Sequence, residues 1–266
     1  MIGSCNYNIH ILVAADYEAD PLDGLYTTTD RSLLKADAAA HGATVIFKEI
    51  AMYSGDALEP GTNTTEIARW NTPPGYEGSV VGRPLGYRSM CRLWSGRLQS
   101  MSFLQPYRYY MRLDDDSYFT ADLPFDPFKA MHERSLQYAW RRDAQDSWGI
   151  EKLWKVAEPL LLGAGTRNTY RQLWAPGGRY NGGQPYNNFH VSSVALWQSP
   201  RVRDLWARAN DAHLFYKYRV GDANYHAMVV MLLGDGEIQR WQSLPYVHNT
   251  NDDSGYPRKE HAQVKC

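Results

Sequence analysis

The sequence lacks the charge excess, the long apolar run and the leader segment that would assign it to several common protein classes. Its 28 Lys and Arg residues balance 29 Asp and Glu residues, so no positive field attracts nucleic acid and we expect no nucleic-acid partner. The apolar run Ala227–Leu233 is far shorter than the ~20 residues of a transmembrane helix. The first ten residues show neither the basic nor the apolar region of a signal peptide. As numbered, the sequence predicts a soluble, cytoplasmic chain without a membrane segment.

Cysteine is also scarce, which argues against a disulfide-stapled fold or a cysteine metal site. The three cysteines, Cys5, Cys91 and Cys266, have no metal-site spacing and are odd in number. For Cys91 we favour a buried, small apolar side chain. With 44% hydrophobic residues, the 266-residue chain can bury a sizeable core, so we expect one folded unit. The 13% of aromatic residues suits either core packing or the binding of sugar rings.

The hydrophobic pattern predicts an α/β fold. An apolar run at Ile9–Ala15, a helical pattern at Asp30–Ala40 and a β-rich run at Thr44–Ile50 indicate a strand–helix–strand unit. Such a unit favours a mainly parallel central sheet flanked by helices. Residues 54–84 are rich in Gly, Pro, Thr and Asn, and we interpret them as a long surface excursion.

Further elements follow from the same patterns. We expect helices at Tyr87–Phe103, Pro127–Tyr138, Leu153–Leu162, Val202–Asn210 and Asp222–Leu233, and strands at Tyr107–Leu113, Glu237–Trp241 and Leu244–His248.

The acidic triplet Asp114–Asp116 is the strongest candidate for chemistry. Three adjacent carboxylates repel one another unless water or a cation stabilises them, so a solvated acidic turn is the alternative. The triplet follows the predicted strand Tyr107–Leu113, and ligands of open α/β sheets bind where strands end. Asp114 and Asp116 would point the same way and ligate one divalent ion, for which Mg²⁺ and Mn²⁺ are suited.

Three other segments offer weaker signals. Asp222 and His226 are one helical turn apart and would orient a hydroxyl or move a proton, or they are an N-cap and a core histidine. His248 ends a β-like run, where an imidazole is either a metal ligand or structural. The segment Tyr186–His190 is rich in aromatic and amide groups, which fits sugar recognition or a turn.

Six segments taken together resemble one enzyme family. They are GYRSMCRLWSG at 86–96, YYMRLDDD at 109–116, LPFDPFKAM at 123–131, YNGGQPYNNFH at 180–190, RVGDANYH at 219–226 and YVH at 246–248. Their order and content are similar to motifs of the fungal α-1,2-mannosyltransferases, glycosyltransferase family 15. The resemblance spans residues 86–248, while the first 85 residues resemble the family only in outline.

The resemblance implies a GT-A fold, a Mn²⁺ or Mg²⁺ ion and a nucleotide-sugar donor, GDP-mannose. It implies one GT-A domain over 1–266, with 1–113 mainly binding the nucleotide and 114–266 mainly binding a glycan or glycoprotein acceptor. The expected chemistry is transfer of a hexose to a glycan hydroxyl with retention of configuration. It also implies a Golgi lumen location if an N-terminal anchor has been removed.

The family's motifs transfer onto individual positions. The metal ligands fall on Asp114 and His248, to which the pattern of carboxylates adds Asp116. The catalytic candidates are Asp222, His190 and His226, and the donor-binding candidates are Tyr87, Arg88, Arg92 and Asp116. The stacking candidates are Trp94, Tyr186 and Trp197, each of which also fits a core role.

Two departures keep other functions open. Asp115 stands where the family has Pro, and His190 stands where it has a Glu proposed as nucleophile, a role for which a neutral imidazole is poorly suited. The alternatives are a GT-A enzyme with another donor, perhaps inverting with Asp222 or His226 as base, a non-catalytic carbohydrate-binding relic, and a metal-dependent hydrolase.

Overall fold

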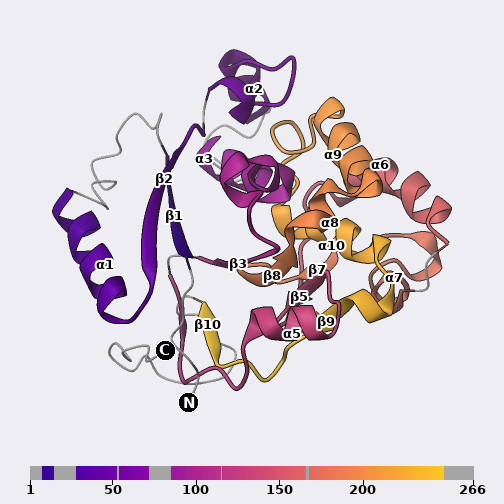
Figure 1. Cartoon of the computed structure of the whole chain (residues 1–266). Coiled ribbons are helices and arrows are strands. Elements are labelled where there is room, and N and C mark those ends of the chain that lie inside the picture. The colour runs from indigo at the N-terminus through magenta and orange to yellow at the C-terminus, as the bar shows by residue number, and fades with distance from the viewer. Residues whose placement is uncertain are drawn as a thin grey trace.

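The computed structural model describes residues 8–14, 28–52, 54–71, 85–114, 116–165 and 168–248. Figure 1 shows three parts side by side: a strand pair with its helix, a central sheet, and a group of helices beyond it. None of the helices in these ranges combines the length and the apolar composition that crossing a bilayer requires.

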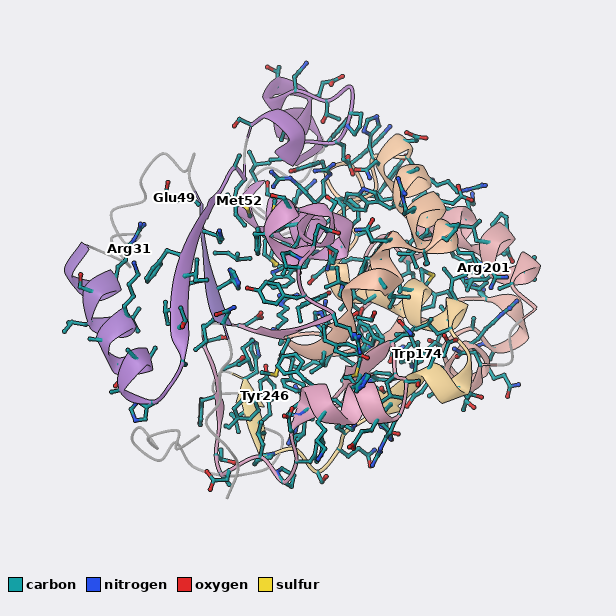
Figure 2. All side chains as sticks on the ribbon, in the orientation of Figure 1. Arg31, Glu49, Met52, Trp174, Arg201 and Tyr246 are labelled. Atoms are coloured by element: carbon teal, nitrogen blue, oxygen red, sulfur yellow. The ribbon has the colours of Figure 1, made fainter. Side chains whose placement is uncertain are left out.

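The N-terminal unit has the predicted strand–helix–strand order. β1 (Asn8–Ala14) pairs in parallel with β2 (Thr44–Ile50), and α1 (Thr28–Ala40) connects them. The expectations for these three elements are confirmed within two residues, while Ala15 lies outside the described residues. Arg31 of α1 lies 3.4 Å from Glu49 of β2, which ties the helix to the strand (Figure 2).

The central sheet has four strands in the order β3 (Tyr109–Leu113), β8 (Phe189–Ser193), β5 (Tyr138–Trp140) and β9 (Ile238–Arg240). β8 runs antiparallel to both of its neighbours, and only β5 and β9 are parallel. The expected mainly parallel sheet is therefore wrong for the described strands, of whose six pairings only two are parallel. The expectation extended the first strand–helix–strand unit to the whole chain and missed β8.

Both faces of β8 are buried, as its central position requires. Phe189 and Val191 pack in one core cluster with Met131 of α5 (Pro127–Glu133). His190 faces the opposite side, where its ring lies 4.9 Å from that of His226 on α10 (Asp222–Leu232). Figure 1 shows α5 and α10 on opposite sides of the sheet.

The remaining helices cover the sheet and form the outer part of the molecule. Trp174 is buried within this outer part, whereas Arg201 is exposed (Figure 2). These helices are α2 (Thr64–Asn71), α3 (Leu85–Arg92), the π-helical segment η2 (Leu93–Arg97), α4 (Leu98–Ser100), α6 (Ile150–Gly163), α7 (Thr169–Trp174), α8 (Val194–Gln198) and α9 (Pro200–Asp211). The short 3₁₀ turns are η1 (Gly55–Ala57), η3 (Ser102–Leu104), η4 (Pro176–Gly178) and η5 (Asp235–Glu237).

Several predicted elements differ from the structure. The expected helix Tyr87–Phe103 is divided into α3, η2, α4 and η3, because Gly96 has non-helical dihedral angles and Met101, between α4 and η3, is extended. The expected helix Pro127–Tyr138 ends at Glu133, since Ser135 has a left-handed backbone and Tyr138 begins β5.

The expected surface excursion at 54–84 also needs correction. Its described part contains η1 and α2, and its side chains Ala57, Glu59 and Ile67 are buried. Residues 72–84 lie outside the described residues.

Two short antiparallel pairs complete the sheet structure. β6 (Asp143–Gln145) pairs with β7 (Gly183–Pro185). β4 (Ser117–Phe119) pairs with β10 (Tyr246–His248), with His248 opposite Ser117. The second pair carries the late histidine to the acidic segment that follows β3.

Candidate active site

The acidic segment lies at the end of β3, as the sequence predicted. β3 ends at Leu113, and the turn from Asp114 leads directly into β4, closed by a 3.0 Å hydrogen bond from Ser117 N to Asp114 O. Asp115 lies outside the described residues. Asp114 is about one-fifth exposed and Asp116 is 43% exposed, so both carboxylates are accessible to a solute.

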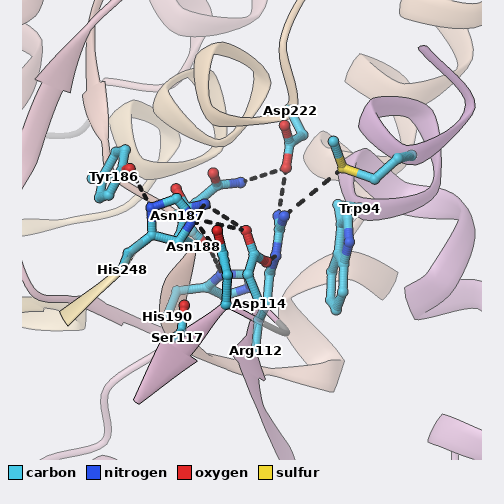
Figure 3. Close-up of polar contacts among 12 residues, drawn as sticks. Trp94, Arg112, Asp114, Ser117, Tyr186, Asn187, Asn188, His190, Asp222 and His248 are labelled. Atoms are coloured by element: carbon cyan, nitrogen blue, oxygen red, sulfur yellow. Dashed lines mark hydrogen bonds and ion pairs between the residues drawn. The ribbon is translucent and has the colours of Figure 1, made fainter. Parts of the chain in front are cut away.

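His248 joins these two carboxylates. Its Nε2 atom lies 3.1 Å from Asp116 Oδ1 and 3.7 Å from Asp114 Oδ2, and one ligand atom from each of the three residues lies within 4.8 Å of the other two. On the other side of the ring, Nδ1 lies 2.7 Å from the Tyr186 hydroxyl, which orients the imidazole (Figure 3). Two carboxylates and one imidazole form a donor set suited to a divalent cation.

Arg112 connects this group to Asp222. Arg112 Nε donates to Asp114 Oδ1 at 2.7 Å, and Nη1 donates to Asp222 Oδ2 at 2.5 Å (Figure 3). The guanidinium also lies 4.2 Å from the centre of the Trp94 ring. The buried guanidinium of Arg112 therefore fixes two carboxylates: Asp114 in the candidate ion-binding group and Asp222 at the start of α10.

The pKa values of these two carboxyl groups shift in opposite directions. Burial raises the pKa of Asp114 above its ordinary value, although Arg112 opposes the rise. Burial also acts to raise the pKa of Asp222, but Arg112, His226 and Asn187 together outweigh it and the net shift is downward. Asp222 is thus held in its ionised form.

Two amides of the turn before β8 contact the same carboxylates. Asn187 Nδ2 donates to Asp222 Oδ2 at 2.9 Å. Asn188 Nδ2 donates to Asp114 Oδ2 and lies 2.8 Å from His248 Nε2 (Figure 3). The turn therefore spans both halves of the site.

The structure places His190 and His226 beneath the site and not in its opening, since both are fully buried. His226 Nδ1 lies 2.7 Å from the Tyr138 hydroxyl, and Nε2 lies 2.9 Å from the Trp94 carbonyl oxygen. Burial lowers the pKa of His226 to about 4 and, with His226 and Arg112 nearby, lowers the pKa of His190 well below its usual value. Both rings are neutral at physiological pH.

The structure does not bring the predicted donor-binding arginines to the acidic group. Arg88 donates to the backbone carbonyl of Tyr216, and Arg92 donates to Asn210 Oδ1 at 3.0 Å and to the Ala57 carbonyl at 2.7 Å. These bonds tie α3 to η1, to α9 and to the segment after α9. A role for either arginine in binding a donor stays a prediction.

Tyr87 lies near enough to Asp222 for the charge of that carboxylate to act on it. Its pKa is raised by its neighbour Cys91, by burial and by the charge of Asp222. Cys91 itself is buried, as expected, and burial raises the pKa of its thiol.

The three predicted stacking residues occupy different positions. Trp94 is covered by Arg112, and Trp197 is buried with its Nε1 donating to Ser192. Tyr186 is half-buried, and the Arg142 guanidinium lies 4.2 Å from its ring centre. Tyr186 contacts His248 directly, whereas Trp94 is linked to Asp114 only through Arg112.

Sequence reasoning missed Arg112, Asn187 and Asn188 as site residues. Arg112 carried a usable signal, because a lone cation two positions before an aspartate on a buried strand requires an anionic partner. The two amides were noticed only as part of a polar segment, because nothing in the sequence shows that β8 lies next to β3.

The fold is that of solved mannosyltransferases. Core-mannan synthase A from Aspergillus fumigatus, in its Mn/GDP form, superposes with a TM-score of 0.75 over 91% of this chain and 66% of that chain, at 18% identity. The mannosyltransferase Ktr4p from S. cerevisiae in complex with GDP gives a TM-score of 0.70 over 84% of this chain and 60% of that chain, also at 18% identity.

The sequence shows the family directly. The profile of the glycolipid 2-alpha-mannosyltransferase family matches residues 79–266, and the chain belongs to this family, which confirms the resemblance found in the sequence. Among named relatives, O-glycoside alpha-1,2-mannosyltransferase homolog 3 of Schizosaccharomyces pombe is 26% identical over 200 residues, covering 70% of this chain and 52% of the relative. Glycolipid 2-alpha-mannosyltransferase 1 of Candida albicans is 28% identical over 180 residues, covering 64% and 41%. The chain spans about half the length of these curated relatives.

Proposed function

We propose that this chain is a metal-dependent mannosyltransferase that transfers mannose from GDP-mannose to a hydroxyl of a glycan or glycoprotein. Family membership supports the reaction, and the Mn and GDP of the A. fumigatus structure support the ion and the nucleotide. The likeness to these structures also supports a single GT-A domain. We propose that residues 1–113 of this domain serve mainly the nucleotide and residues 114–266 mainly the acceptor.

The observation that carries the proposal is the convergence of Asp114, Asp116 and His248. Their ligand atoms lie within 4.8 Å of one another, although β10 joins the acidic turn from the far end of the described chain. Hard carboxylate oxygens with one imidazole nitrogen fit Mn²⁺ or Mg²⁺, and the accessible side of Asp116 leaves room for diphosphate oxygens. These three residues would hold the ion.

Each residue of the site then has a defined task. A bound divalent ion supplies positive charge that stabilises the leaving diphosphate. Tyr186 orients His248, and Arg112 holds Asp114 and Asp222 in a fixed relation. Asp222 Oδ2 accepts from Arg112 and Asn187, whereas Oδ1 accepts no hydrogen bond from a described residue and is left to bind a sugar hydroxyl.

We propose further that the reaction retains the anomeric configuration. Mannose is α-linked in GDP-mannose, and the relatives are named alpha-mannosyltransferases, so an α-linked product corresponds to retention. His226 supports this choice, because both of its nitrogens are engaged and its burial leaves no place for it as the base of an inverting reaction. NMR analysis of the newly formed linkage tests this point, and a β-configured product would contradict it.

The main test of the function is Asp114→Asn, with Asp204→Asn as the matched control. Asp204 is an exposed aspartate of α9 that pairs only with Arg208 among the described residues. We expect Asp114→Asn to abolish Mn²⁺-dependent GDP binding and mannose transfer while the far-UV circular dichroism is unchanged, and the control to retain both. Unchanged Mn²⁺-dependent GDP binding in Asp114→Asn would refute the ligand assignment.

A further inference from the structure

The hydrogen bonds of His190 fix its protonation and its orientation. Its Nδ1 lies 2.9 Å from the carbonyl oxygen of Asn187, which can only accept, so Nδ1 carries the proton. Its Nε2 then accepts from the Tyr110 hydroxyl at 3.1 Å, and that hydroxyl in turn accepts from Gln99 Nε2 at 2.8 Å. The imidazole is neutral and both nitrogens are used.

Aromatic rings enclose the remaining surface of His190. Tyr138 stacks on it with ring centres 5.3 Å apart and planes 11° apart, and Trp94 and His226 meet it edge-on at 6.2 and 4.9 Å. The exposed fraction of His190 is 0%. A sugar has no route to this ring, so His190 does not attack a substrate carbon.

A hydrogen bond leads from His190 to the site through Asn187. The carbonyl of Asn187 belongs to the two-residue turn before β8 whose side-chain amides reach Asp222 and Asp114. Because β8 is fixed between β3 and β5, the Nδ1–H bond anchors this turn to the rigid sheet.

We propose that His190 is a positioning residue that acts through the Asn187 carbonyl to hold the Asn187 and Asn188 amides against Asp222 and Asp114. The inference rests on the proposed function, which assigns the Asp222 carboxylate to a sugar hydroxyl and the Asp114 carboxylate to the ion. It gives the imidazole a task that an ionised glutamate at this position cannot perform, because a carboxylate has no proton to donate to a carbonyl oxygen.

The test uses two substitutions that differ in one property. In His190→Asn the amide nitrogen is attached to Cγ as Nδ1 is, so the donor to the Asn187 carbonyl is kept. In His190→Leu the side chain branches at Cγ as asparagine does, but it has no hydrogen-bond donor. Tyr110→Phe serves as the control, because it removes the partner of Nε2 and leaves the bond to Asn187.

Three readouts are measured on each variant: Mn²⁺ affinity without donor by electron paramagnetic resonance, kcat and KM for transfer, and the side-chain amide resonances in protein labelled with ¹⁵N-asparagine. We expect His190→Leu to weaken Mn²⁺ binding and lower kcat about five- to tenfold each, the effect of one lost hydrogen bond. We expect His190→Asn and Tyr110→Phe to stay within about threefold of the wild type. The Asn187 and Asn188 amide resonances should move in His190→Leu alone.

A role in packing alone predicts the reverse order, because leucine suits a buried apolar site better than asparagine. Activity that followed thermal stability, with His190→Leu at least as active as His190→Asn, would overturn the proposal. Equal loss of transfer in His190→Asn and His190→Leu with unmoved amide resonances would also overturn it. Failure of the proposed function would appear instead in the wild type, as absence of Mn²⁺ binding and of transfer, and the amide resonances would then still decide the role of His190.

Discussion

Arg112 allows the electrostatic reasoning to be tested quantitatively. Its side chain is 4% exposed and bonds Asp114 at 2.7 Å and Asp222 at 2.5 Å. Replacement by methionine keeps an unbranched apolar stem and removes the charge, together with its contact over the Trp94 ring. Asp222, whose side chain is 9% exposed, is then left in the interior without its counter-ion.

The expected loss follows from the cost of an uncompensated buried charge. Removing one partner of a buried ion pair destabilises proteins by about 3–5 kcal/mol, and we expect a value in this range for Arg112→Met. Asp222→Asn should cost less, about 1–3 kcal/mol, because Arg112 keeps its bond to Asp114. The double variant should be more stable than the sum of the two losses predicts, with a coupling energy of about 1–3 kcal/mol.

Urea denaturation at pH 7 measures these quantities, provided that the dependence of the free energy on urea concentration is unchanged among the variants. A loss below about 1 kcal/mol in Arg112→Met, or additive effects in the double variant, would refute the view that Arg112 compensates the buried carboxylate of Asp222.

The other predictions concern the buried Glu59, the closely packed Gly182 and His248. Burial raises the pKa of Glu59 from 4.5 to about 8, so between these pH values the folded state holds a proton that the unfolded state releases. The contribution of this group to the free energy of unfolding is therefore fully present below pH ~4.5 and is lost as the pH rises to about 8. Glu59→Gln should remove this decline of up to ~1.4 kcal/mol per pH unit in thermal or urea unfolding, and an unchanged slope would contradict the shift. Gly182→Ala should destabilise the protein by more than ~2 kcal/mol, because the backbone of Gly182 is left-handed and a Cβ atom would lie 2.1 Å from Asp146 O. Gly178→Ala should cost only about 1–2 kcal/mol in the same assay, because Gly178 is also left-handed but has free space where its Cβ atom would lie. His248→Ala should weaken Mn²⁺ binding at least tenfold by calorimetry with the fold intact, and equal affinity would exclude this imidazole as a ligand.

The parts of the fold that sequence patterns predicted are the local ones. β1, α1 and β2 alternate in periodicity over short distances, and the helices around Leu153–Leu162 and Asp222–Leu233 have long apolar patterns. β8 was missed because its five residues are buried on both faces and include His190 and two serines, which hide the apolar run expected of a central strand. The antiparallel order of the sheet depends on β8 and was lost with it.

The residues of the candidate site also differ in how far the sequence alone could predict their roles. Asp114, Asp116 and His248 were found because carboxylates after a strand and a motif-bound histidine carry their chemistry in the residue type, and the structure brings these three together. Arg88 and Arg92 were expected near a donor because arginine binds phosphate, but each guanidinium bonds backbone carbonyls of neighbouring segments. Which of these two roles a buried arginine takes is decided by tertiary contacts, which a single sequence does not contain.

The pairing of β4 with β10 has a consequence for the order in which the protein becomes functional. Ser117 and Tyr246, whose hydroxyl oxygens lie 2.8 Å apart, are separated by 129 residues, and the pairing covers three residues of each strand. Closing so long a loop costs entropy that only a few contacts repay, so this pair should form late in folding. During synthesis, the acidic turn leaves the ribosome well before its histidine partner. A nascent chain that ends before Tyr246 therefore has the carboxylates but lacks the histidine of the proposed ion site, and the proposed capacity to bind an ion should arise abruptly when β10 docks.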